Sequence, residues 1–170
     1  MNISTAMLRE LRDQTGAGIM ACRNTLLETE GDLEKALHLL KERSITIIQK
    51  KADRTVSQGL IEAYIHTGGT IGSMVEVNCE TDFVARTSEF KELAHNLAMQ
   101  VAAMPPKFIS REDIPEGPEG KDVDPEADCL LLQTSIKDPD KTIQDVINEA
   151  IAKLRENIKV NRFARFKLGS

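Results

Sequence analysis

Histidine and cysteine side chains are the groups of this chain best suited to acid–base, nucleophilic or metal chemistry. The chain contains three of each, namely His38, His66, His95, Cys22, Cys79 and Cys129. Nucleophilic catalysis needs a nucleophile held beside a base, and the histidines fall in different predicted elements with no HExxH, GxSxG or Cys–His cluster. An odd number of widely spaced cysteines without a CxxC pair indicates free thiols in a reducing compartment. We therefore predict no catalytic residue and no metal site, and expect the cysteines to be small buried hydrophobic residues.

Glycine patterns that bind nucleotide phosphates are also missing. The sequence has no GxxxxGK[ST] motif and no GxGxxG motif after a strand, so we expect no nucleotide site made by this chain. Gly16-Ala17-Gly18 is the nearest candidate, and a turn between two helices explains it better. We expect no cofactor, and the residues favour binding over catalysis.

Composition and charge limit the partners of the chain. Its 170 residues are 41% hydrophobic, enough for one or two packed domains. No apolar run approaches the roughly 20 residues that cross a bilayer. The first residues lack a basic stretch followed by an apolar core, so we expect no secretory signal and a cytoplasmic location. The net charge of −5 disfavours nucleic acid as a partner, although two basic segments, 41–54 and 153–167, flank an acidic one, 111–128.

Three short helices are predicted near the amino terminus. Ser4 or Thr5 can cap the first helix, Gly16 is a suitable left-handed stop, and Asp32 can cap the third helix. The second helix is expected to carry Ile19, Cys22, Leu26 and Leu27 on one side. A bundle of this size has room for little beyond an aliphatic core, which indicates a small recognition module.

The remainder of the chain predicts an α+β fold, an antiparallel sheet covered by helices. Gly68-Gly69 between two β-prone runs predicts a hairpin, and Pro105-Pro106 ends a strongly periodic helix. The expected elements are strands over 60–66 and 71–77, a helix over 85–104, a strand-like stretch over 129–132, a helix from Asp140 or Thr142 to Leu154, and a final strand. That strand is expected to bury Ile158, Val160, Ala164, Phe166 and Leu168.

The segment Asn78–Arg86 joins the predicted hairpin to the helix that follows it. Thr81 or Asp82 is well placed to cap that helix. Extending its apolar stripe backward reaches Phe83, so burial of this ring in the core is one interpretation. The other is an exposed aromatic side chain at a rigid helix entry. Such a ring loses little entropy when it enters a hydrophobic pocket of a partner.

Three motifs, in order along the chain, resemble those of the elongation factor Ts family. Leu11-Arg12, Thr15-Gly16-Ala17-Gly18-Ile19-Met20 and Cys22 are similar to the amino-terminal signature of that family. The segment 76–86, which reads EVNCETDFVAR, resembles its second and more diagnostic signature. The segment 157–166 is similar to its carboxyl-terminal strand. The resemblance extends over nearly the whole chain.

The resemblance implies a nucleotide exchange factor for the translational GTPase elongation factor Tu, with no catalytic chemistry of its own. It implies a three-helix module of the ubiquitin-associated (UBA) type with a basic linker over 1–54, and an α+β core over 55–170. Residues carried over from the family fall in two groups. The segment Thr81, Asp82, Phe83 and Val84 would disturb the magnesium site of the GTPase, with Phe83 entering between two of its helices. Arg12, Ile19 and Met20 would contact the GTPase from the amino-terminal module.

Both groups of residues also have ordinary interpretations. Arg12 could be a solvated surface charge, and Ile19 and Met20 could belong to the core of the bundle. Two adjacent helical residues cannot both face one small core, so we expect at least one of them to be free.

The chain departs from the family between 104 and 129. Longer members have extra helical sequence there, where this chain has mainly the acidic loop 111–128, and they contain two related core halves. Short members resemble a single half that pairs with itself. We therefore expect a homodimer.

Two other functions are alternatives to nucleotide exchange. A general adaptor, binding another partner through the three-helix module, explains the helices but not the motif at 76–86. RNA or ribosome binding would use the two basic segments, but one tyrosine and no tryptophan offer few stacking surfaces. We expect no direct binding of nucleic acid or membrane.

Overall fold

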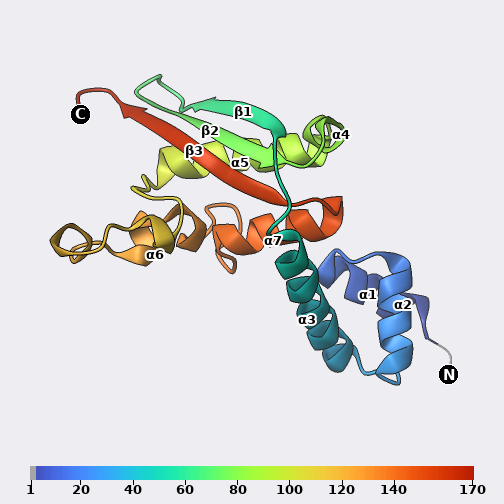
Figure 1. Cartoon of the computed structure of the whole chain (residues 1–170). Helices are drawn as coiled ribbons and strands as arrows, with labels where there is room; N and C mark the ends of the chain where they lie inside the picture. Colours follow the sequence, from blue (N-terminus) through green and yellow to red (C-terminus); the bar gives the residue numbers. More distant parts are fainter. Residues whose placement is uncertain (1–2) are drawn as a thin grey trace.

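The computed structural model describes residues 3–170, so residues 1 and 2, which begin the predicted module 1–54, lie outside the described residues. A bundle of three helices comes first, and a three-stranded antiparallel sheet packed with helices follows it (Figure 1). The predicted α+β fold class is confirmed. No helix between residues 3 and 170 is long and apolar enough to cross a membrane.

The bundle consists of α1 (Thr5–Thr15), α2 (Ile19–Glu28) and α3 (Leu33–Lys51). Its ends follow the predicted capping rules. The Ser4 hydroxyl accepts a hydrogen bond from the backbone N–H of Met7, and Asp32 accepts one from that of Lys35. Gly16 ends α1 in the left-handed conformation, with a φ of 65°. The helices enclose a small core of their own, formed by Leu11, Cys22, Leu26, Ala36 and Leu40.

The bundle differs from the predicted pattern in two respects. Of the four residues predicted on one side of α2, Ile19 and Leu27 are 57% and 44% exposed, because a three-helix bundle this small covers only a narrow stripe of α2. Thr25 is buried on that stripe instead, and its hydroxyl accepts a hydrogen bond from Arg43. The third helix is also longer than predicted, since α3 continues to Lys51 through most of the basic segment 41–54. Near its end Ile48 packs against the core of the α+β part.

The sheet has the order β1 (Gln58–Ile65), β2 (Ile71–Cys79), β3 (Ile158–Lys167), with both pairs antiparallel. The predicted hairpin is confirmed, with Gly68 and Gly69 at positive φ in its turn. Figure 1 shows α5 (Ser88–Ala103) and α7 (Ile143–Leu154) on one side of the sheet. Between the layers lies the main core, which includes Val75, Val77, Phe90, Leu97, Val101, Leu130, Ile147 and Ile151.

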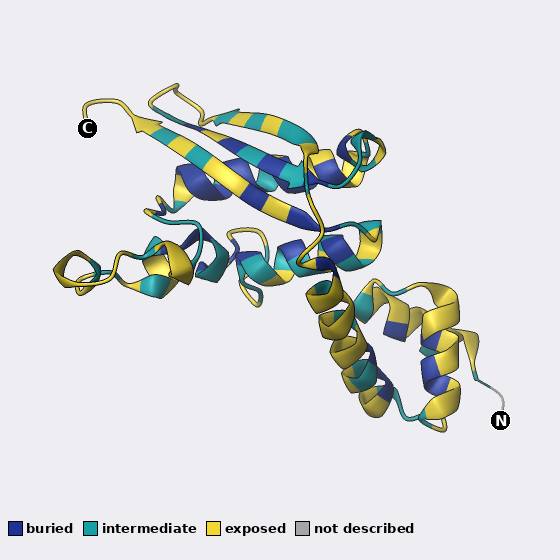
Figure 2. Cartoon of the chain, viewed as in Figure 1, coloured by how far each residue is buried: buried dark blue, intermediate teal, exposed yellow. Residues whose placement is uncertain are grey.

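A β-bulge changes the direction of the side chains along β3. Glu76 pairs with Arg162 while its neighbour Val77 pairs with Val160, so Asn161 is an extra residue. An extra residue moves every later side chain to the opposite face of the sheet. Ile158 and Val160 are buried as predicted, but burial of Ala164, Phe166 and Leu168 was wrong. Figure 2 shows this change from buried to exposed along the strand.

The connection between β2 and α5 differs from the prediction. Thr81 caps a separate one-turn helix, α4 (Asp82–Ala85), and α5 has its own cap at Thr87. Because α4 and α5 are distinct helices, the apolar stripe of α5 does not continue back to Phe83. Of the two residues predicted to cap the last helix, Thr142 and not Asp140 caps α7, in a capping box with Asp145.

The segment between α5 and α7 has short turns of helix. They are η1 (Arg111–Asp113), η2 (Pro118–Gly120), α6 (Pro125–Asp128) and η3 (Leu130–Leu132). The stretch 129–132 is therefore not a strand, although Cys129 forms an isolated bridge with Phe108. Leu130 is buried in the main core and holds the end of the segment. The acidic loop projects from the body on the side away from the three-helix bundle (Figure 1).

Candidate protein-binding site

The most exposed aromatic ring outside the sheet belongs to α4. Phe83 is 77% exposed, although the two apolar residues that follow it in sequence are covered. Ala85 is buried in the main core, and Val84 packs against that core. These two contacts fix the inner side of the turn and direct Phe83 outward. Of the two interpretations of Phe83, the structure supports the exposed one.

Local hydrogen bonds give α4 a defined conformation despite its length of four residues. The Thr81 hydroxyl accepts a hydrogen bond from the backbone N–H of Val84, at 3.4 Å. Asp82 forms an ion pair with Arg86 one turn later, with 2.9 Å between the carboxylate and the guanidinium. Capping and burial together hold the ring in position before any partner binds, which lowers the entropic cost of binding.

A second candidate surface lies on the three-helix bundle, at the turn between α1 and α2. Ile19 and Met20 begin α2, and they are 57% and 58% exposed. Both are thus free, where at least one was expected. Arg12 is exposed in the last turn of α1. Its backbone carbonyl accepts the N–H of Gly16, so this turn is closed by a hydrogen bond of 2.8 Å. In the view of Figure 1, the bundle and α4 lie toward the same side of the molecule.

A third exposed surface was missed by the sequence analysis. It is the face of the sheet opposite α5 and α7, and we call it the outer-face patch. Its exposed side chains are Ile61, Ile65, Met74, Phe166 and Leu168. Cross-strand pairing places Met74 between Ala63 of β1 and Ala164 of β3. The signal that could have revealed the patch is the alternation of β1, where Ile61, Ala63 and Ile65 occupy one face.

The groups first considered for catalysis have ordinary environments. All three cysteines are buried and free, as predicted. Burial raises the pKa of the Cys79 thiol to about 11, which makes it a poor nucleophile. His66 and His95 both lie near the ring of Tyr64, and the Nδ1 atom of His95 is 2.9 Å from a Glu62 carboxylate oxygen. Among residues 3–170, no group of three His, Cys, Asp or Glu side chains is arranged to hold a metal ion.

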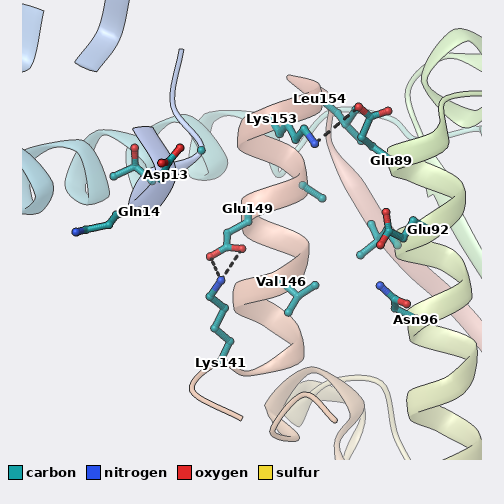
Figure 3. A pocket seen from close by; sticks show the side chains of 14 residues that line it. Asp13, Gln14, Glu89, Glu92, Asn96, Lys141, Val146, Glu149, Lys153 and Leu154 are labelled. Atoms are coloured by element: carbon teal, nitrogen blue, oxygen red, sulfur yellow. Dashed lines mark hydrogen bonds and ion pairs between the residues drawn. The ribbon is translucent and has the colours of Figure 1, made fainter. Parts of the chain in front are cut away.

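The groove between α1, α5 and α7 contains two ion pairs. Figure 3 shows Lys141 beside Glu149, at 2.9 Å, and Lys153 beside Glu89, at 3.7 Å. The two lysines therefore neutralise two of the carboxylates that line the groove. The exposed apolar surfaces described above are better candidates for binding a protein than this groove.

The sequence comparisons identify the family. A family model described as "Elongation factor TS" matches residues 19–122. The chain is 46% identical over 194 residues to the elongation factor Ts of Caldanaerobacter subterraneus subsp. tengcongensis, covering 98% of this chain and 97% of that protein. The chain belongs to the elongation factor Ts family. It has further similarity to the elongation factor Ts of Heliobacterium modesticaldum, with 46% identity over 98% of this chain and 90% of that protein. For the elongation factor Ts of Thermotoga neapolitana, identity is 44% over 99% of this chain and 98% of that protein.

Membership of the elongation factor Ts family gives the chain a role in translation elongation. The alignments also show a difference in length. Because 98% of the 170-residue chain is about 167 residues, about 27 of the 194 positions aligned with the first relative lack a residue of this chain. This chain is thus shorter than that relative.

Proposed function

We propose that this chain is a guanine nucleotide exchange factor of elongation factor Tu. It would bind the GDP-bound GTPase, disturb the magnesium site and promote GDP release so that GTP can bind. The observation that carries this proposal is the exposure of Phe83 on a capped and anchored turn. It lies within the motif that gave the family resemblance, and an exposed, preordered aromatic ring suits insertion into a partner.

The four residues of the motif would have different tasks. Phe83 is the anchor that enters the GTPase, and the Asp82 carboxylate beside it would face the magnesium site of the partner. Thr81 and Val84 would position them, since one caps the turn and the other packs it against the core. Arg12, Ile19 and Met20 would form a separate contact that brings the GTPase to α4. The magnesium ion belongs to the partner, and this chain supplies neither a cofactor nor a catalytic group.

Thermodynamic linkage explains how such contacts release a nucleotide. A factor that binds the GTPase better without GDP must weaken GDP binding by the same ratio. Each tenfold loss of GDP affinity needs about 1.4 kcal/mol of differential contact, and burial of one aromatic anchor can supply roughly 2 kcal/mol or more. Phe83 is therefore sufficient for part of the effect, and the remaining contacts keep the complex in register.

The organisation of the chain supports a division into two parts. A UBA-like module over 1–54 and a core over 55–170 would correspond to the two hydrophobic clusters. Helix α3 links them, because it contributes Leu40 to the first cluster and Ile48 to the second. We place the protein in the cytoplasm with the translation machinery, without direct binding of nucleic acid. The net charge of −5 argues for that last point, because nucleic acid is a polyanion and is attracted by a basic surface.

The outer-face patch would hold a second copy of the chain. Its members are apolar and lie on one face of an open sheet, and two such faces can pack together as the layers of a sandwich. A twofold axis would place the outer-face patch of one protomer against the same patch of its partner, so the patch needs to be complementary only to itself. A homodimer of this kind would present two copies of α4, one from each protomer.

Stopped-flow release of a fluorescent GDP analogue from elongation factor Tu tests the exchange function. We expect the wild-type chain to accelerate release, Phe83→Ala to lose most of the acceleration, and Ile136→Ala to retain it. Ile136 is the control because it is also an exposed apolar residue but lies outside α4, the amino-terminal bundle and the outer-face patch. If wild type does not accelerate release at any concentration, exchange is wrong and the adaptor function becomes the better hypothesis.

A further inference from the structure

Two loops beside α4 are joined by reciprocal hydrogen bonds. One loop, at Glu80 and Thr81, leads from β2 into α4, and the other, at Glu156 and Asn157, leads from α7 into β3. One carboxylate oxygen of Glu156 accepts the backbone N–H groups of Glu80 and Thr81, each at 3.0 Å, and the other accepts the hydroxyl of Thr81. In return, the Glu80 carboxylate accepts the backbone N–H of Asn157 at 2.7 Å. We call these contacts the carboxylate clamp.

The clamp fixes the residue that caps α4. The Thr81 hydroxyl has one hydrogen to donate and lone pairs that accept. Because it donates to Glu156, its lone pairs are directed toward the N–H of Val84. Hydrogen bonds to a charged carboxylate are stronger than bonds between neutral groups, and Glu156 makes three of them to this short segment. Without Glu156 the hydroxyl could rotate and the two backbone groups would lose their protein acceptor.

The same clamp reaches the end of the long helix of the bundle. The buried side-chain amide of Asn157 donates to the backbone carbonyls of Ala52 and Arg54, at 3.2 and 2.9 Å. Arg54 also lies 3.5 Å from the Glu80 carboxylate. These residues follow α3 directly. The clamp therefore connects the turn that carries Phe83 with the exit of α3, which leads back to the amino-terminal bundle.

We propose that Glu156 is a positioning residue for partner binding, holding α4 in the conformation that presents Phe83 while Asn157 ties that turn to α3. The inference rests on the proposed exchange function. Glu156 is half-buried and its carboxylate is occupied by Glu80 and Thr81, so it acts through them and not by touching the GTPase. Neither Glu156 nor Asn157 was among the site residues expected from the sequence.

Glu156→Gln is the sharpest test, because the side chain keeps its size while one carboxylate oxygen is replaced by an amide nitrogen, which cannot accept a hydrogen bond. Glu149→Gln is the matched control, since it changes an exposed glutamate of α7 outside the clamp. Amide hydrogen exchange is measured by NMR on both variants. We expect protection of the Glu80 and Thr81 amides to fall about tenfold in Glu156→Gln, with the β2 amides unchanged. The control should keep wild-type protection at all of these amides.

Nucleotide release measured over a range of factor concentrations gives the functional readout. In Glu156→Gln we expect the concentration for half-maximal acceleration to rise about tenfold while the maximal rate changes little, because a loosened anchor pays more entropy on binding. Thr81→Val should have a similar effect, and combining both substitutions should add little, because they break one unit.

The outcomes separate the two proposals. If wild type accelerates release and Glu156→Gln matches it in both half-maximal concentration and amide protection, the positioning role is wrong while exchange stands. A loss of protection throughout β2 would also overturn it, because Glu156 would then stabilise the whole fold. If wild type fails to accelerate release, the exchange function itself is wrong, and the positioning role is overturned with it.

Discussion

Truncating one ring of the outer-face patch should separate the two copies of the proposed homodimer. Phe166 is 72% exposed, and a phenylalanine side chain can bury roughly 150–250 Å². At about 25 cal/mol per Å², Phe166→Ala forfeits about 2 kcal/mol of burial after allowing for the area that alanine retains. A twofold interface contains the residue twice, so the total is about 4 kcal/mol, or about a thousandfold in the dimer dissociation constant.

Sedimentation equilibrium over a concentration series measures that constant directly. We expect wild type to be dimeric at micromolar concentration and Phe166→Ala to be monomeric there but folded, with an unchanged circular dichroism spectrum, because the ring contributes little to the fold of one protomer. Phe83→Ala is the matched control, since it removes an equally exposed ring that lies outside the patch. A monomeric wild type, or a Phe166→Ala protein as dimeric as wild type, would refute the reasoning.

Three further predictions concern stability and reactivity. The Arg162 guanidinium donates a hydrogen bond to Glu76 and so lowers the pKa of that carboxyl. The resulting stabilisation is complete above the ordinary glutamate pKa and is lost as the pH falls through the lower pKa of the folded state. Urea unfolding of Glu76→Gln should therefore show a smaller loss of stability than wild type between about pH 6 and about pH 3. The raised pKa of Cys79, about 11, predicts alkylation by iodoacetamide at about pH 8 at least about 100-fold slower in native protein than in urea; equal rates would show that the thiol is not buried. In Gly59→Ala the new Cβ would overlap the Val77 carbonyl oxygen at a φ of 148°, so calorimetry should show a loss of about 2 kcal/mol or more, and an unchanged melting temperature would contradict this geometry.

Helix ends and the hairpin were predictable because short-range chemistry determines them. Ser4, Asp32 and Thr142 cap helices through bonds to residues three positions on, and Gly16 ends a helix through its own backbone freedom. None of these features depends on residues distant in the sequence. The family signature was also readable directly, since it is a string of adjacent residues.

Features that depend on distant contacts were missed or wrong. Whether β3 continues its alternation depends on its register with β2, and the extra residue Asn161 has no sequence signal of its own. The separation of α4 from α5 depends on Thr87 capping α5. From the sequence pattern alone, Thr81 or Asp82 is an equally suitable cap for that helix. Glu156 meets Thr81 across 75 residues of sequence, so only the folded chain reveals the clamp.

Affinity for the two states of the GTPase tests the exchange function most directly. Isothermal titration would measure binding of the wild-type chain to nucleotide-free elongation factor Tu and to its GDP- and Mg²⁺-bound form. Linkage predicts that the chain binds the nucleotide-free form at least about tenfold more tightly than the GDP-bound form. The affinity of the GTPase for GDP should fall by the same factor when the chain is bound. Equal affinities for the two forms would contradict exchange, because a factor that does not distinguish them cannot shift the nucleotide equilibrium.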